Sequence, residues 1–238
     1  MLKIISKNWK NILMKKNKKL NIFQKIFDFK YFFFDFVKLT GIIPTILFLR
    51  LKRYYISGKK PKGIFNGPFI AVSNHTTMID PVIIMNTIWN RRVSFVATKE
   101  LFDSKFGNFF FNSIRCIKID KDNVSMQTFK SVKNVIERGH ITSLFPEGHI
   151  ETTDSIDNFK SGAVMFAVLC NVPIVQIYIE KRKHWYNRQR VVISNKLEIK
   201  DLIKSKIPSV EEIMEITKLL EKQEQELKEV LIKNKNRK

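Results

Sequence analysis

Beyond residue 57 the chain alternates short apolar runs with stretches that repeat at helical spacing, and this alternation constrains the fold most. The run ITSLF at 141–145, for example, follows a periodic stretch at 128–138 that Gly139 ends. Strands separated by helices form βα units, which place parallel strands in one central sheet between helical layers. We therefore predict an α/β fold with a mainly parallel central sheet flanked by helices. The other expected strands are 69–73, 93–97, 115–119, 172–179 and 191–194, and the other expected helices are 82–89 and 162–170.

The chain divides into three expected regions: an N-terminal segment at 1–56, a catalytic domain at 57–200 and a C-terminal helix with a basic tail at 201–238. The stretch SGKKPKGIFNGP at 57–68 is rich in Gly, Pro and Lys, which marks a boundary between structured segments. In the last region Ser209 and Glu212 have the spacing of a helix capping box. Apolar residues then recur at helical spacing, which predicts a structural helix. They are Ile213, Ile216, Leu220, Leu227 and Leu231.

The N-terminal segment carries much of the positive charge of the chain. Residues 1–60 contain fifteen Lys or Arg against two Asp, whereas the whole chain has a formal net charge of +21. Residues 20–36 combine basic and aromatic residues on a helical repeat, which is typical of amphipathic helices that lie in a membrane interface. The apolar core of the stretch 39–51 is short for a bilayer-spanning helix and contains Pro44, so we expect a shallow or re-entrant segment, with a spanning helix as one alternative. The other alternative is that both stretches pack against the protein's own core.

The high net charge predicts an anionic partner, either lipid headgroups or nucleic acid. The sequence has no zinc-finger or RNA-binding signature, and the Phe-rich segment is too apolar for a base-stacking platform, so we expect an anionic bilayer surface and no nucleic acid. The two cysteines, Cys116 and Cys170, lie far apart without metal-ligand spacing. They indicate neither a disulfide framework nor a metal site.

The motif NHTTMID at 74–80 places a histidine between an apolar run and a predicted helix. Asp80 and Pro81 form a good helix start, because Asp accepts hydrogen bonds from free N–H groups and Pro is favoured in the first turn. A turn before that helix can fold the Asp80 carboxylate back onto the His75 imidazole. A carboxylate against one ring nitrogen leaves the other nitrogen to accept a proton from a hydroxyl group. The alternative is that Asp80 is only a cap and His75 only a polar strand end.

Other polar groups are predicted at the same edge of the sheet. The motif FPEGH at 145–149 places Glu147 and Gly148 at the end of the strand 141–145, where functional residues of parallel sheets gather. FKSG at 159–162 precedes a helix whose first amides can hold an anion. No GxSxG motif is present and neither cysteine has a catalytic pattern, so we expect direct attack by an activated hydroxyl without a covalent enzyme intermediate.

These motifs together resemble the conserved blocks of the glycerolipid acyltransferases, the 1-acylglycerol-3-phosphate acyltransferase family. NHTTMID is similar to the first block, NHxxxxD, and the other blocks follow in the family's order across residues 55–195. The second block is KELF at 99–102 with Gly107 and IKID at 117–120 followed by Lys121, the third is FPEG at 145–148, and the fourth is VPIV at 172–175.

The resemblance implies a catalytic role for His75 as general base, with Asp80 as its orienting partner. It implies that Glu147 and Gly148 help to bind the acceptor and that Lys99 and Lys121 contribute to substrate binding. The donor would be an acyl thioester of coenzyme A or of acyl carrier protein, used as a substrate, with no cofactor. The acceptor would be a lyso-lipid, most simply 1-acylglycerol-3-phosphate. The enzyme would sit on the cytoplasmic membrane, peripheral or monotopic, with its active site on the cytosolic face.

The sequence also departs from the family pattern. The third block usually continues FPEGTR, with an arginine for the acceptor phosphate, but His149 and Ile150 stand at the matching positions. Without the planar guanidinium a bidentate phosphate contact is lost. Candidates to replace its charge are Lys121, Arg115, Lys118 and Lys160, whereas His149 is either a partial replacement or an ordinary loop histidine. A phosphate-free lyso-lipid or amphiphilic alcohol as acceptor and a lipid-binding protein without turnover remain the alternatives.

Overall fold

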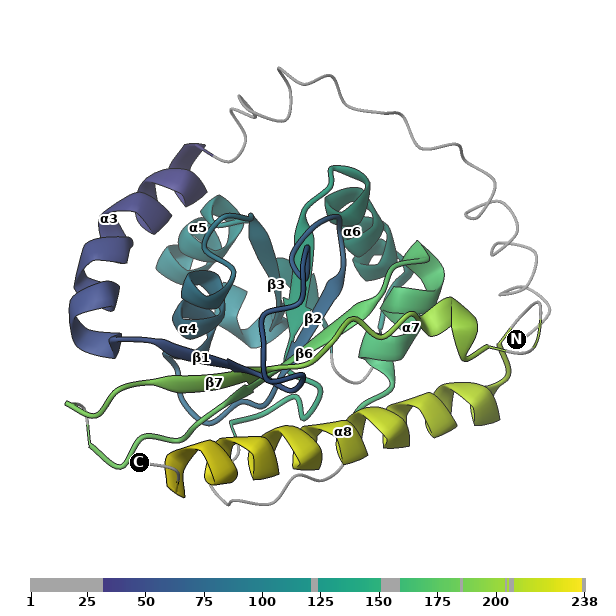
Figure 1. The fold of residues 1–238 in the computed structure, drawn as a ribbon. Helices are drawn as coiled ribbons and strands as arrows, with labels where there is room; N and C mark the ends of the chain where they lie inside the picture. Colours follow the sequence, from purple (N-terminus) through teal and green to yellow (C-terminus); the bar gives the residue numbers. More distant parts are fainter. Residues whose placement is uncertain are drawn as a thin grey trace.

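A seven-stranded sheet forms the centre of the computed structural model, which describes residues 32–120, 124–150, 159–184, 186–203, 205 and 208–236. The strand order is β1-β7-β6-β2-β5-β3-β4, and every pairing among these strands is parallel except β6 with β7. This confirms the predicted α/β fold with a mainly parallel sheet (Figure 1). The strands are β1 Lys52–Tyr55, β2 Ile70–Ser73, β3 Val93–Thr98, β4 Ile117–Ile119, β5 Ile141–Leu144, β6 Ile174–Ile179 and β7 Arg190–Ile193.

Helices cover both faces of the sheet, because its central strands are apolar on both sides. In β2, for example, Ile70 and Val72 point to one hydrophobic cluster and Ala71 to the other. One cluster lies under α6, α7 and α8, and the other under α4, against which α3 packs (Figure 1). Continuous apolar runs are typical of parallel strands buried on both faces. The helices are α3 Phe32–Leu49, α4 Asp80–Thr87, α5 Lys105–Ser113, α6 Met126–Glu137, α7 Gly162–Cys170 and α8 Val210–Asn236, with 3₁₀ turns at Lys99–Phe102 and Ile199–Asp201.

Each strand and helix predicted beyond residue 57 is present, with ends that move by a few residues. The strand β1 is not predicted, because KRYY is short and polar at its start and lies among basic residues. It pairs in parallel with β7, opposite Arg190–Ile193, and so extends the sheet before residue 57. Its partner lies more than a hundred residues away, a relation that local patterns do not reveal.

The helix α3 differs from the expected N-terminal arrangement. The sequence predicts an interfacial helix at 20–36 and a separate shallow segment at 39–51, but residues 32–49 form one continuous helix that includes Pro44. Most of the predicted interfacial helix, at 20–31, lies outside the described residues. None of the helices in the described ranges is long and apolar enough to cross a membrane.

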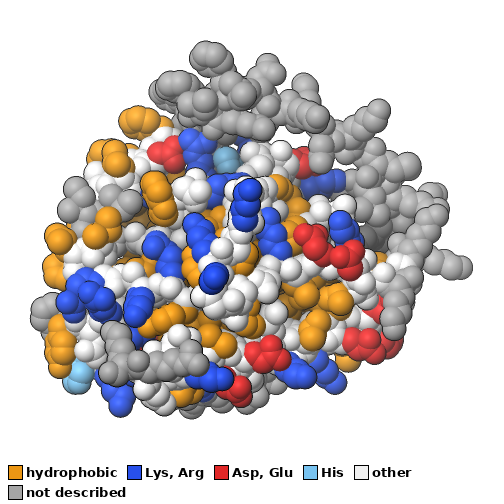
Figure 2. Space-filling model, viewed as in Figure 1, with side chains coloured by type: hydrophobic (Ala, Val, Ile, Leu, Met, Phe, Trp, Pro, Cys, Tyr) orange, Lys and Arg blue, Asp and Glu red, His pale blue; other side chains and the backbone are white. Residues whose placement is uncertain are grey.

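The outer surface of α3 is apolar, whereas several of its polar side chains face the body of the protein. Asp35 forms an ion pair with Arg92, with Oδ2 2.6 Å from Nη2. Lys38 donates a hydrogen bond of 2.6 Å to the carbonyl of Arg91, and burial lowers its pKa from 10.5 to about 8. In contrast, large apolar side chains on the outside are more than half exposed (Figure 2, left). They are Phe32, Phe36, Leu39, Ile46, Leu47 and Phe48.

The C-terminal helix α8 begins with the predicted capping box. The Glu212 N–H donates to Ser209 Oγ at 3.2 Å, and the Ser209 N–H donates to Glu212 Oε2 at 3.0 Å. The predicted residues Ile216, Leu220, Leu227 and Leu231 are buried against the sheet. Figure 1 shows α8 running along the length of the sheet.

Gly107 lies where the start of α5 approaches the preceding 3₁₀ turn. A Cβ atom at this position would lie 2.3 Å from the backbone oxygen of Leu101 and 2.8 Å from Ser104 Oγ. We expect Gly107→Ala to lower the free energy of unfolding by about 1–3 kcal/mol, because backbone must shift to admit the methyl group. The midpoint of urea unfolding measures this change. Gly41→Ala in α3 is the matched control, since its added Cβ meets nothing within 4 Å, and equal midpoints for the two variants would contradict the prediction.

Candidate active site

His75, Asp80 and Glu147 of the predicted site gather at the carboxyl edge of the sheet. His75 follows β2, and Glu147 follows the neighbouring strand β5. The side chain of His75 is 16% exposed, whereas that of Asp80 is fully buried. The edge therefore presents an imidazole to solvent above a buried carboxylate.

Asp80 is held by a dense set of hydrogen bonds. Its Oδ2 lies 3.0 Å from His75 Nδ1 and accepts the backbone N–H groups of Thr76 at 2.6 Å and Thr77 at 2.8 Å. The Thr77 hydroxyl donates to Oδ1 at 2.7 Å. Donors of this kind stabilise an ionised carboxylate. A carboxylate only accepts, so His75 carries its proton on Nδ1, which leaves Nε2 as the acceptor.

The role of Asp80 in the helix differs from the predicted cap. The helix α4 does begin at Asp80, but the N-cap residue is Ile79, and no side chain caps the first turn. The carboxylate binds N–H groups of the turn before the helix instead of those within it. The Asp80 carboxylate thus lies against the His75 imidazole, as the spacing predicts, and it also holds the backbone of the turn at residues 75–77.

The turn after β5 supports His75 from two sides. The ring of Phe145 stacks on the imidazole, with centroids 4.0 Å apart and planes inclined by 15°. The buried Glu147 accepts the backbone N–H of His75 through Oε2 at 3.2 Å. The sequence does not predict Phe145 as a site residue, although it opens the FPEG motif.

Asn74 joins the turn at residues 75–77, the histidine turn, to the sheet. Its Nδ2 donates to the carbonyl of Ile179 at 3.0 Å, and its Oδ1 accepts the Ile179 N–H at 2.7 Å. The side-chain amide thus continues the pairing of β2 with β6 beyond Ser73. The sequence analysis also does not predict Asn74 as a functional residue, and its place beside His75 in the motif is the only local signal.

Gly148 lets the FPEG turn reverse direction beside a lysine. Its φ of +75° lies in the left-handed region, where a side chain is strained. An added Cβ would lie 3.5 Å from Lys160 Nζ, which locates the ammonium group over the turn. The Lys160 N–H donates to the carbonyl of Pro146 at 2.9 Å. His149 turns back toward its own loop, with Nδ1 3.0 Å from the carbonyl of Glu147.

The other predicted substrate-binding cations differ in position. Lys99 pairs with Asp120 at 2.7 Å, and the Nζ of Lys118 lies 5.5 Å from the centre of the Phe102 ring. Arg115 precedes β4, at the opposite end of that strand from the carboxyl edge. Lys121 lies outside the described residues. Of the three predicted replacements for the missing arginine that the structure describes, Lys160 is the one that it brings to the FPEG turn.

Both cysteine thiols are poor nucleophiles in this fold. Burial raises the pKa of Cys116 and of Cys170 from 9.0 to about 12. The reactive form of cysteine is the thiolate, which such a pKa disfavours at neutral pH. This agrees with a mechanism in which neither cysteine takes an acyl group.

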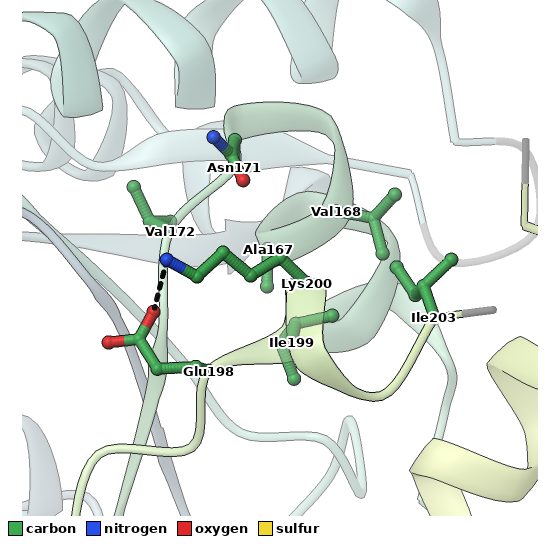
Figure 3. Close-up of a pocket in the computed structure, with 8 residues that line it drawn as sticks. All are labelled: Ala167, Val168, Asn171, Val172, Glu198, Ile199, Lys200 and Ile203. Atoms are coloured by element: carbon green, nitrogen blue, oxygen red, sulfur yellow. Dashed lines mark ion pairs between the residues drawn. The ribbon is translucent and has the colours of Figure 1, made fainter. Parts of the chain in front are cut away.

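Two hollows differ in their relation to this site. One of about 150 Å³ adjoins the histidine turn, where Thr76, Thr77 and Asp80 face Arg182 and Lys183. The other, of about 60 Å³, lies at the far end of α7 and around Ile199 (Figure 3). Its charged lining is the pair Lys200 and Glu198, 4.0 Å apart, and none of the predicted site residues that the structure describes lines it.

Comparisons with known proteins find sequences that are similar to this chain. The acyltransferase family matches residues 52–180, which is more than half of the chain. A probable 1-acyl-sn-glycerol-3-phosphate acyltransferase of Mycoplasma pneumoniae is 28% identical over 139 residues, which cover 56% of this chain and 52% of that protein. The chain thus spans about half the length of that relative. The 1-acyl-sn-glycerol-3-phosphate acyltransferase of Bacillus subtilis is 24% identical over 168 residues, covering 68% of this chain and 82% of that protein.

The fold is also that of a solved structure. The crystal structure of the 1-acyl-sn-glycerophosphate acyltransferase of Thermotoga maritima superposes with a TM-score of 0.56 at 17% identity. The match covers 82% of this chain and 80% of the other.

Proposed function

The chain belongs to the acyltransferase family, and on that premise we propose that it transfers a fatty acyl group from an acyl thioester to the free hydroxyl of a lyso-lipid. The observation that carries this proposal is the pairing of His75 Nδ1 with the buried, hydrogen-bonded carboxylate of Asp80. This pairing leaves Nε2 to act as a general base. The donor is a thioester of coenzyme A or of acyl carrier protein.

The proposed reaction needs no covalent enzyme intermediate. The acceptor oxygen attacks the thioester carbonyl carbon while its proton moves to His75 Nε2. The C–S bond then breaks, and the departing thiolate takes the proton back from the imidazolium, so that the products are an ester and a free thiol. Asp80 stabilises the imidazolium between these steps, and the stacked Phe145 ring holds the imidazole in place.

The helix α7 offers an anion-binding element near this chemistry. It follows the segment after β5 and leads into β6, so its N-terminus lies at the carboxyl edge of the sheet. Its N-cap residue, Ser161, makes no side-chain hydrogen bond to the first amides. We propose that these amides stabilise negative charge on the substrate.

We propose 1-acylglycerol-3-phosphate as the acceptor, with Lys160 in the role of the missing arginine. The ammonium group over Gly148 supports this assignment, because it stands beside the turn in which the family arginine is replaced by Ile150. An ammonium supplies the charge but not the bidentate geometry. The relatives named as acyltransferases for this acceptor add support. Glu147 and Gly148 are proposed to shape the acceptor site around it.

The experiment measures transfer of a labelled acyl group from acyl-CoA and from acyl carrier protein to a panel of lyso-lipids. For Lys160→Ala we expect KM for 1-acylglycerol-3-phosphate to rise about tenfold, the loss of one charge-assisted contact, with little change for a phosphate-free acceptor. Lys62→Ala, an exposed lysine in the loop before β2, is the matched control. A wild-type preference for phosphate-free acceptors would refute the proposed acceptor, and no turnover with any pair would favour the lipid-binding alternative.

We also propose that the protein binds an anionic bilayer through α3, from which acceptor and product are exchanged. The apolar outer surface of α3 and its inward-facing Asp35 and Lys38 support this orientation. Arg50, which ends the exposed stretch, supplies positive charge beside that surface. Basic residues next to an apolar helix favour anionic lipid surfaces.

A further inference from the structure

A buried glutamate in α8 is not used by the proposed reaction. Glu224 is 1% exposed and lies in the apolar stripe of the helix, between Leu220 and Leu227. Its Oε1 atom has no hydrogen-bond partner among the described residues. A carboxyl group in such a place opposes folding unless it is neutral or fulfils a role.

The groups that face Glu224 are predominantly negative. They are Glu147 of the FPEG turn, Glu221 of the same helix and, with opposite sign, Lys228. Glu147 is also buried and accepts the backbone N–H of His75. Two neighbouring buried carboxyl groups cannot both ionise without strong repulsion, so a proton must reside on one of them.

The contacts assign that proton to Glu224. Glu147 accepts a hydrogen bond from the histidine turn, whereas Oε1 of Glu224 has no hydrogen-bond partner among the described residues. Burial, first, and then the charges of Glu147 and Glu221 raise the pKa of Glu224 well above 4.5, opposed by Lys228. Glu224 is therefore the neutral acid of the two.

The helix α8 is fixed to the site around this residue. Gln176 in β6 donates through Nε2 to the carbonyl of Leu220 at 2.9 Å. One residue further on, Glu221 Oε1 accepts the Phe159 N–H at 2.8 Å, just before Lys160. Glu224 thus occupies a defined place beside the FPEG turn.

We infer that Glu224 is a positioning residue of the active site, a neutral acid supplied by the C-terminal helix, whose lack of charge allows Glu147 to stay in place under the His75 turn. This inference rests on the proposed function, because it assigns Glu224 a part in the same site. Ionisation of Glu224 would push Glu147 away from the His75 N–H and loosen the base. The acyltransferase site then includes a residue of α8. The local sequence pattern predicts only a structural role for this helix.

The first test is the pH dependence of stability. The folded wild type retains a proton that the unfolded chain releases above about pH 4.3, so its stability falls as the pH rises from there toward the raised pKa of Glu224. Glu224→Gln removes this penalty, and we expect its Tm to exceed that of the wild type by about 2–4 °C or more at pH 9, with a smaller difference at pH 5. Glu226→Gln, an exposed residue of the same helix, is the control, and equal pH dependence for the two variants would overturn the inference.

The second test separates positioning from packing. Glu224→Gln cannot ionise, so its kcat at pH 9, taken relative to pH 7, is expected to exceed the corresponding wild-type ratio about tenfold. A wild-type kcat that falls with rising pH no more steeply than that of Glu224→Gln would overturn the inference. If the wild type transfers no acyl group, the proposed function fails, and a double-mutant cycle of Glu224→Gln with Glu147→Gln in Tm still decides whether the residues act together. If Glu224→Gln raises Tm by the same amount with and without Glu147→Gln, the two residues do not interact and the inference is refuted.

Discussion

His75→Ala is expected to lower the rate of acyl transfer by about 10²–10⁴-fold, the usual contribution of a positioned general base. The substitution removes the Nε2 atom that accepts the hydroxyl proton. It leaves Asp80 bonded to the Thr76 and Thr77 amides, so the turn is expected to keep its shape. The measurement is the single-turnover rate with acyl-CoA and 1-acylglycerol-3-phosphate.

Two controls test whether the loss of rate comes from the missing base and not from unfolding or from weaker membrane binding. The variant should keep the wild-type Tm within a few degrees, because His75 is partly exposed and Phe145 can remain in place. It should also bind anionic liposomes as the wild type does, since α3 is unchanged. A variant that retains a tenth or more of the rate would remove His75 from the role of base.

The triple variant Phe36→Ser, Leu39→Ser and Leu47→Ser is expected to weaken binding to anionic liposomes by about 100-fold or more. These side chains are 54%, 71% and 67% exposed in the absence of lipid. Full burial of one such side chain contributes about 1.5–3 kcal/mol. Inserting the exposed part of all three therefore contributes about 3–6 kcal/mol, which exceeds the roughly 2.8 kcal/mol that corresponds to 100-fold. Liposome co-sedimentation at several lipid concentrations gives the partition coefficient.

The matched control replaces Met214, Leu219 and Ile232 with serine. These are also exposed apolar residues, at 51%, 40% and 50%, but they lie on α8. We expect this variant to bind liposomes as the wild type does, because α8 is not the proposed membrane contact. The control thus separates the loss of α3 contacts from a general loss of surface hydrophobicity. Equal binding by both triple variants and the wild type would exclude α3 as the membrane contact, and a steep salt dependence without lipid specificity would point to charge alone.

Much of the fold is predictable because its helices and strands have clear patterns of apolar residues. The helix α8 has one apolar face, and the central strands are continuous apolar runs. The α7 helix occupies the predicted residues 162–170, and the capping box at Ser209 and Glu212 starts α8. These features depend on residues close together in the chain. The strand β1 and the continuous helix through Pro44 depend on distant partners, β7 and α4, that stabilise segments whose local sequence is ambiguous.

The site shows the same division between local and distant relations. The approach of Asp80 to His75 spans five residues and is visible as a motif with turn chemistry. The bond from Glu147 to the His75 backbone spans 72 residues, and the amide pair of Asn74 with Ile179 spans 105. Glu224 is hidden by its helix, because a single glutamate in an apolar stripe gives no local sign of the carboxylate that it faces.

The two hydrogen bonds of Asn74 have a consequence for motion. They lock the residue before His75 to the end of β6, as a further rung of the ladder between the two strands. Because β6 lies in the interior of the sheet, the backbone next to His75 cannot shift toward a substrate without breaking these hydrogen bonds to β6. We therefore expect the position of His75 to stay the same when substrates bind. The movements that bring the hydroxyl and the thioester together then have to come from the substrates or from the helices around the carboxyl edge.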